Sequence, residues 1–388
     1  MKIKSLEDNF FGKYGNRDNK PVLFFSPGRV NLIGEHTDYN GGYVFPCALN
    51  YGTYLFIRKN PDNNLKFSTL NFNSDETVPI KGLFKNTSKK WINYPLGVVN
   101  EFLKRGIQIS GMEMLFYGDV PNGAGLSSSA SIEMVTAVAL NEMFNAGFTT
   151  IDLVKMSQKA ENEFVGMNCG IMDQFAVGFG KRDHAIFLNC DTLEYENVPI
   201  VLKDDSLIIT NTNKRRGLTD SKYNERRAEC ESAVVYMNKY RQIRNLSELN
   251  TEEIPLLDKY IPDPVVRKRA KHVISENGRV SEAVKVLRDN NLVRFGELMN
   301  LSHDSLKDDY EVTGNELDTL VYEARKLPGV IGSRMTGAGF GGCTVSIVRK
   351  EYVERFIKDL GIVYSAKTGL IAEFFRPEVG PGAAKIDY

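Results

Sequence analysis

Cysteine and histidine are scarce and scattered in this chain of 388 residues. The five cysteines, Cys47, Cys169, Cys190, Cys230 and Cys343, are far apart and form no C-x-x-C pair. Their odd number and wide spacing argue against a disulfide framework and a zinc site, and they fit a reducing compartment. The four histidines form no H-x-x-x-H pair either. The sequence therefore predicts a cytoplasmic protein without disulfides or zinc.

Net charge and long apolar runs are also missing. The 49 Lys and Arg residues balance 49 Asp and Glu residues, which removes the general electrostatic reason to expect binding to nucleic acid or to an anionic membrane. No apolar run approaches the roughly 18–20 residues that span a bilayer. The first ten residues, MKIKSLEDNF, contain no apolar signal core. We therefore expect neither a membrane nor a nucleic acid among the partners.

Strand and helix signals are mixed along the whole chain. Residues 20–60 are rich in β-branched and aromatic residues, with turn signals at Pro27-Gly28 and at residues 40–42. Further strands are expected at 112–120, 206–212 and 370–375. Helices are expected at 92–105, 129–146, 152–165, 219–243, 264–275, 280–289, 291–300 and 351–359. At about 100–200 residues per domain, the length predicts two or three domains. We expect two, residues 1–200 and 201–388, because a half with strands and helices gives way to a more helical half at about residues 195–205.

The most informative segment is PNGAGLSSSASIEMVTAVAL, residues 121–140. Glycines and three serines lie between an expected strand and an expected helix, and exposed N–H groups at a helix start attract phosphate. No lysine follows the glycines, so this is not a Walker A loop. Glu142 would lie on the helix rather than after a second strand, so a dinucleotide fingerprint is incomplete. On its own the segment is either a phosphate site or a capped turn that packs a helix on a sheet.

A second segment, SPGRVNLIGEHTDYNGG, spans residues 26–42. Glu35, His36, Thr37 and Asp38 follow an apolar stretch there, and short hydrogen-bonding side chains of this kind suit a polyhydroxylated ligand. Arg29 follows a turn, from which its guanidinium could face a developing negative charge. The alternative is a polar loop and a surface arginine, all facing water.

Asp173 is the only charged residue between Gly166 and Gly180. A carboxylate in an apolar run is costly unless it is paired. Asp173 is therefore either a structural hydrogen bonder or a functional base or metal ligand. Glu161 precedes it on an amphipathic helix, where ordinary exposed charge is the alternative to a functional role.

A second glycine-rich loop lies near the C-terminus. MTGAGFGGCTVSIV, residues 335–348, has four glycines in residues 337–342, directly before a β-branched strand. Folding alone seldom needs so many glycines, because each carries an entropic cost. The segment therefore predicts another place where the backbone closely approaches a ligand.

In combination these segments resemble the GHMP kinase superfamily, named for galacto-, homoserine, mevalonate and phosphomevalonate kinases. GAGLSSSA (123–130) is similar to its phosphate loop, and MTGAGFGG (335–342) to its C-terminal glycine motif. GRVNLIGEHTDYNGG (28–42) resembles the signature of the galactokinase family nearly residue for residue. GIMDQ (170–174) and DSKYNERRAEC (220–230) fit as well, so the matches run in order along almost the whole chain.

The resemblance implies an α+β fold of two domains, with mixed sheets, helices packed on them, and the active site in the cleft between the domains. It implies that Asp173 is the catalytic aspartate beside the attacking sugar hydroxyl and that Arg29 stabilises the transition state. The implied sugar contacts are Glu35, His36, Thr37, Asp38, Gly170 and Tyr223. The implied nucleotide contacts are Gly123, Ala124, Gly125, Leu126, Ser127, Ser128 and Ser129, with Ser68 added from its place in F-S-x-x-N. Ser129 and Glu161 match the magnesium ligands.

The implied activity is transfer of the γ-phosphate of ATP, with Mg²⁺, to the anomeric hydroxyl of D-galactose, in galactose catabolism. The product would be α-D-galactose 1-phosphate, and the partners of a monomeric enzyme would be the small molecules galactose and ATP. One alternative is a kinase for a related sugar such as N-acetylgalactosamine. Another is a non-catalytic sensor of galactose and ATP. The intact GLSSSA (125–130), with Asp173 and Glu161, argues against the sensor.

Overall fold

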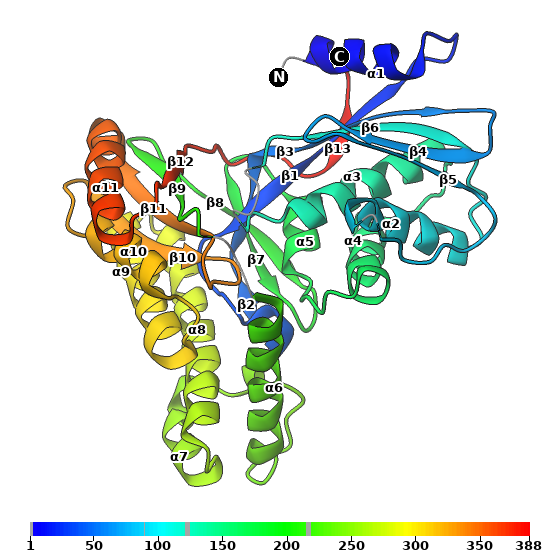
Figure 1. The fold of residues 1–388 in the computed structure, drawn as a ribbon. Coiled ribbons are helices and arrows are strands. Elements are labelled where there is room, and N and C mark those ends of the chain that lie inside the picture. The colour runs from blue at the N-terminus through cyan, green and yellow to red at the C-terminus, as the bar shows by residue number, and fades with distance from the viewer. Residues whose placement is uncertain (1–2, 89, 121–124, 215–218) are drawn as a thin grey trace.

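The structure is a computed structural model that describes residues 3–88, 90–120, 125–214 and 219–388. Three β-sheets organise these residues, and helices pack on the sheets (Figure 1). The fold is therefore of the mixed α+β class that the sequence predicts.

The first sheet has six strands and is mixed, because β4 and β6 pair in parallel. In spatial order its strands are β13 (Ala384–Ile386), β1 (Val22–Asn31), β3 (Pro46–Lys59), β6 (Met112–Gly118), β4 (Asn64–Thr69) and β5 (Ser74–Pro79). Successive apolar side chains of a strand point to opposite faces. Leu23 thus packs with helix α1 (Ile3–Tyr14), while Phe24 belongs to the core on the other face.

Four helices cover that other face of the first sheet (Figure 1). They are α2 (Asn93–Lys104), α3 (Ser128–Met143), α4 (Thr150–Lys159) and α5 (Met172–Phe179). A small third sheet lies beside them and joins β2 (Tyr43–Val44), β7 (His184–Asn189) and β8 (Tyr195–Pro199).

The second sheet is antiparallel and lies in the C-terminal half of the chain. Its strands are, in order, β10 (Val330–Thr336), β11 (Cys343–Arg349), β9 (Asp205–Asn211) and β12 (Glu373–Phe375). One face packs on α10 (Asn315–Ala324) and α11 (Val353–Thr368). The other face packs on α8 (Pro264–Arg288), α9 (Leu292–Ser305) and apolar residues of the N-terminal half, such as Val30 and Phe45. The two halves of the chain therefore share one continuous core.

Helices α6 (Thr219–Met237), α7 (Leu257–Tyr260) and α8 form an arm that projects from this second sheet (Figure 1). The arm has an apolar cluster of its own, which includes the π-helical turn Leu306–Tyr310 at the end of α9. Across the described parts of the chain, no helix is both long and apolar enough to cross a membrane.

Three local expectations are wrong. Residues 264–275 and 280–289 belong to one helix, α8, because Gly278 brings the helix against the Thr251 side chain instead of ending it. Pro27-Gly28 is not a turn: β1 continues through it with a register shift. The helix expected at 152–165 ends at Lys159, and a π-helical turn, Ala160–Val165, follows.

Candidate active site

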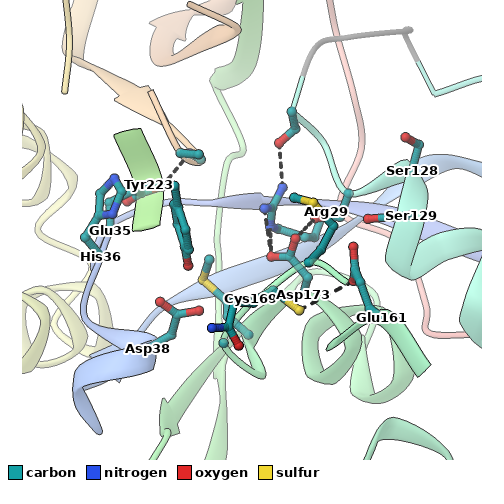
Figure 2. Close-up of a pocket in the computed structure, with 18 of the residues that line it drawn as sticks. Arg29, Glu35, His36, Asp38, Ser128, Ser129, Glu161, Cys169, Asp173 and Tyr223 are labelled. Carbon is teal, nitrogen blue, oxygen red and sulfur yellow. Dashed lines mark hydrogen bonds and ion pairs between the residues drawn. The ribbon is translucent and has the colours of Figure 1, made fainter. Parts of the chain in front are cut away.

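A cavity of about 420 Å³ lies between the two halves of the chain and gathers most of the predicted site residues (Figure 2). Those that line it are Arg29, Glu35, His36, Asp38, Gly125, Ser127, Ser128, Ser129, Glu161, Gly170, Asp173 and Tyr223. Gly123 and Ala124 lie outside the described residues. Segments that are far apart in the sequence thus meet at one site.

Arg29 and Asp173 form an ion pair in this cavity. Arg29 is almost fully buried on β1, and its Nη2 lies 2.7 Å from Asp173 Oδ1, with Nε donating to the same oxygen at 2.8 Å. Its Nη1 donates to the carbonyl of Gly125 at 2.7 Å. Figure 2 shows the guanidinium directed at the carboxylate at the start of α5. The arginine is therefore no surface residue, and the aspartate is paired.

Ser127 is the residue before α3 and would be expected to cap that helix. Its side chain makes no cap hydrogen bond, and its backbone is left-handed, with φ 58°. The hydroxyl instead donates to Asp173 Oδ2 at 2.5 Å. The Ser127 side chain therefore does not cap the first N–H groups of α3, and Ser128 and Ser129 line the cavity at this helix start. An uncapped helix start of this kind favours a bound anion.

Glu35 connects the segment of residues 28–42, called the first signature below, to the C-terminal glycine motif of residues 335–342. Its carboxylate is buried, forms an ion pair of 2.5 Å with Arg334 Nη2, and accepts a hydrogen bond from the Gly337 N–H at 2.9 Å. Burial raises the pKa of Glu35, and the guanidinium of Arg334 opposes that rise. The glycine motif therefore lies at the cavity because a buried charge pair holds it there.

His36 and Asp38 face the same part of the cavity (Figure 2). Burial lowers the pKa of His36 to about 3, so the imidazole is neutral. Burial also raises the pKa of Asp38 to about 6, and the negative charge of Asp173 adds to that rise. A Cβ atom at Gly170 would come within 2.0 Å of Asp38 Oδ2, so glycine lets this loop touch the carboxylate. The ring of Tyr223 packs beside His36, with centroids 5.7 Å apart.

Glu161 lies on the π-helical turn and is buried rather than exposed. Gln174 Nε2 donates to Glu161 Oε2 at 2.6 Å and to Glu133 Oε2 at 3.1 Å. Burial, and then the charge of Asp173, raise the pKa of Glu161. Burial, and then the charge of Glu161, raise the pKa of Glu133 well above its ordinary value. The site thus crowds the carboxyl groups of Glu133, Glu161 and Asp173 together, close enough that the pKa values of Glu133 and Glu161 are raised.

Among the described residues, no group of three or more Asp, Glu, His or Cys side chains could hold a metal ion by itself. Magnesium does not require such a group, because it keeps several waters and takes few protein ligands. The Glu161 carboxylate and the Ser129 hydroxyl, which bonds to it and lowers its pKa, are oxygen donors of the right kind. The crowded carboxyls around them would be relieved by a divalent cation, so the residues present fit Mg²⁺.

A second cavity of about 190 Å³ adjoins the first through Ser128 and Ser129. Thr69, Trp91 and Tyr94 contribute to its wall. It also includes Thr53, Asn71, Phe72, Phe116, Gly118, Val120 and Ile132. The sequence did not predict these residues as part of the site. Only the F-S-x-x-N segment, residues 67–71, pointed to this region of the chain.

Three predicted residues do not reach either of these cavities. Ser68 lies on the face of β4 opposite to Thr69, which lines the second cavity. The Ser68 Oγ is 2.7 Å from the Tyr14 hydroxyl, and Ser68 lines a separate cavity beside α1. The Thr37 hydroxyl lies 2.9 Å from the Gly34 carbonyl and 2.7 Å from the Tyr43 carbonyl, and it donates its proton to these backbone oxygens instead of facing the cavity. Leu126 packs in the shared core, while its carbonyl accepts a hydrogen bond from the Arg29 N–H at 3.1 Å. Cys169 and Ala338 line the first cavity without having been predicted.

Comparison with known families defines the class of protein. The models of the GHMP kinases N terminal domain and the GHMP kinases C terminal match residues 93–181 and 283–366. The crystal structure of Methanococcus jannaschii mevalonate kinase has the same fold, with a TM-score of 0.69 at 18% identity over 94% of this chain and all of that one. The chain is thus a member of the GHMP kinase superfamily.

The relatives narrow this further. The model of the galactokinase galactose-binding signature matches residues 8–59. A galactokinase of Fusobacterium nucleatum is 54% identical over 99% of this chain and 98% of its own, and one of Clostridium beijerinckii is 51% identical over 97% of each. The crystal structure of Lactococcus lactis galactokinase complexed with galactose has a TM-score of 0.96 at 44% identity, covering 99% of this chain and 100% of that one. This chain belongs to the galactokinase family.

Proposed function

We propose that this chain transfers the γ-phosphate of ATP to the anomeric hydroxyl of D-galactose, giving α-D-galactose 1-phosphate and ADP. Membership of the galactokinase family supports the overall activity, which is the phosphorylation of galactose with ATP. The observation that supports the finer proposal is the position of Asp173. It lies between the cluster of polar residues from the first signature and the open N-terminus of α3.

The sugar occupies the side of the cavity formed by Glu35, His36, Asp38, Gly170 and Tyr223. Carboxylates accept hydrogen bonds from hydroxyls, the neutral imidazole supplies one donor or acceptor, and the Tyr223 ring offers an apolar face. Asp38 is held against Gly170, so its oxygens have a defined direction. This combination of acceptors and an aromatic ring fits a hexose better than an anionic substrate.

The nucleotide occupies the other side. The triphosphate lies at the open start of α3, where the helix dipole and free N–H groups favour negative charge. Ser128 and Ser129 belong to both cavities, so the second cavity continues from the phosphate position. Trp91 and the aromatic residues around it provide flat apolar contacts that suit a nucleobase.

Ser129 and Glu161 would hold Mg²⁺ near the phosphates. When bound, the ion supplies charge neutralisation on the phosphate oxygens. Gln174 keeps Glu161 directed by a hydrogen bond to one of its oxygens. The binding of Mg²⁺ therefore depends on the π-helical turn that carries Glu161.

Phosphoryl transfer depends mainly on positioning and on electrostatic stabilisation. Asp173 orients the attacking hydroxyl and accepts its proton, and Arg29 holds that carboxylate while it faces the charge that develops on the transferred group. Because Ser127 occupies Asp173 Oδ2 in this structure, the sugar hydroxyl takes the place of the Ser127 hydroxyl when galactose binds.

The decisive test measures ADP release with Mg-ATP and a panel of hexoses. We expect turnover with galactose and a product with phosphate on the anomeric oxygen. A preference for N-acetylgalactosamine would show that this sugar, and not galactose, is the substrate. Galactose binding without turnover would indicate a sensor.

The metal site has a test of its own. Ser129→Ala and Glu161→Gln should each weaken Mg²⁺ binding measured directly by titration in the presence of a non-hydrolysable ATP analogue. Titration curves of the two variants that coincide with the parent curve would show that neither residue binds the metal.

A further inference from the structure

The backbone of the turn at the sugar side of the cavity is unusual. Gly34 has a φ of 100° and His36 a φ of 62°, so the residues on either side of Glu35 are both left-handed. This conformation is unfavourable for histidine and persists only where the surrounding structure holds it. The backbone angles set the directions in which the Glu35 and His36 side chains leave the chain, and both side chains line the cavity (Figure 2). Groups that hold this backbone therefore shape the site.

One face of helix α8 packs against the turn. His272, Glu276 and Val280 follow one another at intervals of four residues, which places them on one side of the helix. A Cβ atom at Gly34 would lie 2.9 Å from Val280 Cγ2 and 2.7 Å from the Tyr43 carbonyl. A side chain at position 34 would therefore push the helix and the turn apart.

Two side chains of this face bind the backbone around Glu35. Glu276 Oε1 accepts a hydrogen bond from the Gly34 N–H at 2.9 Å. His272 Nε2 lies 3.1 Å from the Glu35 carbonyl. A carbonyl oxygen can only accept, so the imidazole of His272 donates this hydrogen bond. The two contacts thus fix the peptide group before Gly34 and the peptide group after Glu35.

Both helix side chains are fully buried and are held by further contacts. Glu276 accepts hydrogen bonds from the Ser302 hydroxyl at 2.5 Å and from Arg279 Nε at 2.6 Å. The Nδ1 atom of His272 lies 2.9 Å from the Ser305 hydroxyl. Neither side chain can therefore reorient easily, and the geometry that they impose on the turn is well defined.

The protonation states of the two side chains suit these contacts. Burial acts to raise the pKa of Glu276, but the positive charge of Arg279 and of other groups nearby outweighs it and lowers the pKa to about 2. Burial lowers the pKa of His272 to about 4. At neutral pH, Glu276 is therefore a charged acceptor, and His272 is a neutral imidazole with one proton.

A third residue of α8 binds the other end of the turn. Asn277 Oδ1 accepts a hydrogen bond from the Tyr43 N–H at 2.9 Å, and a Cβ atom at Gly42 would come within 2.5 Å of the same oxygen. Within the described part of the chain, the wall of the cavity includes none of the residues His272, Glu276 and Asn277. These residues therefore act on the site through the backbone of the turn.

We propose that His272 and Glu276 are positioning residues, which hold the turn from Gly34 to His36 in the form that directs side chains to the sugar. The inference rests on the proposed function for the identity of the sugar, and it adds the contacts that keep the sugar side in shape. When a contact is lost, the turn adopts this form for only part of the time, and the apparent affinity for galactose falls by that fraction. ATP binds at the other side of the cavity, so its affinity should not change.

Two substitutions of His272 separate positioning from general stability. The amide of glutamine can reach the place of Nε2 and donate to the Glu35 carbonyl, whereas the shorter asparagine cannot. His272→Asn should raise the KM and the Kd for galactose roughly 2- to 10-fold, the range of one neutral hydrogen bond, with kcat and the KM for ATP little changed. His272→Gln should recover most of the parent affinity. Equal effects of the two variants, or a loss of kcat alone, would overturn the proposal.

Glu276 allows a second comparison of the same kind. Glu276→Leu removes a charged acceptor and should raise the KM for galactose roughly 10- to 100-fold. Glu276→Gln keeps an oxygen for the Gly34 N–H and should lie between Glu276→Leu and the parent. The matched control is Tyr364→Phe, which removes another buried donor to a backbone carbonyl, that of Thr212, and should leave the KM for galactose unchanged. An equal rise of KM in the control would show that any lost buried hydrogen bond weakens galactose binding, and it would overturn the positioning role.

Hydrogen–deuterium exchange of the turn provides a measurement that does not depend on galactose. In the ligand-free parent, peptides that cover residues 34–43 should exchange slowly, and His272→Asn should accelerate exchange in these peptides. Saturating galactose should restore slow exchange in the variant. Rapid exchange of residues 34–43 in the parent would overturn the proposal, whether or not any variant folds. A parent with a protected turn but without galactose binding or turnover would contradict the proposed function, while the protection would still support the contacts inferred here.

Discussion

At the scale of single residues, the hydrogen bonds and ion pairs of the Asp173 carboxylate are central to the candidate site. Both oxygens of Asp173 are engaged, one by Arg29 and the other by Ser127. A carboxylate held in this way has little freedom to reorient when a substrate binds. We expect different carboxylates to bind the sugar and to accept the proton, and kinetics can separate these two roles.

Asp173→Asn should lower kcat about 10²- to 10⁴-fold, the usual contribution of general-base catalysis. Galactose affinity should stay within a small factor, since the amide keeps the shape of the side chain. Steady-state kinetics and equilibrium binding of galactose test this. Asp359→Asn, at an exposed ion pair on α11, is the matched control and should leave both quantities unchanged. A near-parent kcat in Asp173→Asn would show that this carboxylate is not the base.

Galactose binding should weaken as the pH falls through about 6. Burial raises the pKa of Asp38 to about 6 in the ligand-free site, with Asp173 adding to the rise and Arg29 opposing it. Below that pH the carboxyl is protonated and loses acceptor capacity, whereas above it the carboxylate accepts from hydroxyls. His36 stays neutral through this range, because its pKa is about 3. Calorimetric titrations at several pH values test this, and an affinity that is flat from pH 5 to 8 would contradict it.

At the scale of elements, helix ends and turns supply the chemistry. The start of α3 stays open because Ser127 bonds to Asp173 instead of capping the helix. A π-helical turn brings Glu161 inward, a feature that is often found at functional sites. The loop before α5 carries Gly170 against Asp38. Each departure from regular geometry serves a side chain in the cavity.

Gly170→Ala should raise the KM for galactose, because the new Cβ would displace the Asp38 carboxylate that lies 2.0 Å from its position. Gly12→Ala is the matched control: this glycine lies in α1 with no atom within 4 Å of a new Cβ. The control should keep parent kinetics and unfold at the same or a slightly higher temperature. An unchanged KM in Gly170→Ala would mean that Asp38 is free to move and does not read the sugar.

At the scale of the whole molecule, the two halves are tied together at the site itself. The Glu35–Arg334 pair links the end of the first signature to β10, and both side chains are fully buried. Strand β13, from the last residues of the chain, pairs with β1 in the first sheet. The division at residues 1–200 and 201–388 stays a prediction, and any unit cut at residue 200 would lose this strand.

Glu35→Gln should lower the free energy of unfolding by about 3–5 kcal/mol, since it leaves the buried Arg334 without a charged partner. Galactose affinity should fall in the same variant. Glu35→Leu combined with Arg334→Met should recover part of the stability but not the binding. Urea unfolding and galactose titration measure the two effects. Equal stability of Glu35→Gln and the parent would show that the pair does not hold the halves together.

Local patterns were sufficient for the parts of the site whose chemistry lies within one segment. The glycine–serine stretch before α3 and the polar cluster after β1 are recognisable because a turn, a helix start and a row of short polar side chains depend on neighbouring residues. Most strands and helices were predicted for the same reason. The resemblance to the galactokinase signature rests on such segments too.

Contacts between distant segments could not be predicted, because spacing along the chain does not say which buried groups meet. The ion pair of Glu35 with Arg334, and the hydrogen bonds that join the side chains of Tyr39, Tyr310 and Cys230, form only when separate elements pack together. Ser68 and Thr69 are adjacent in the sequence but lie on opposite faces of β4, so the orientation of the strand decided which of them lines the cavity next to Ser128 and Ser129. Burial then altered what these groups do: it neutralised His36 and placed the pKa of Asp38 near 6. Such shifts depend on desolvation and on neighbouring charge, and both are properties of the folded molecule.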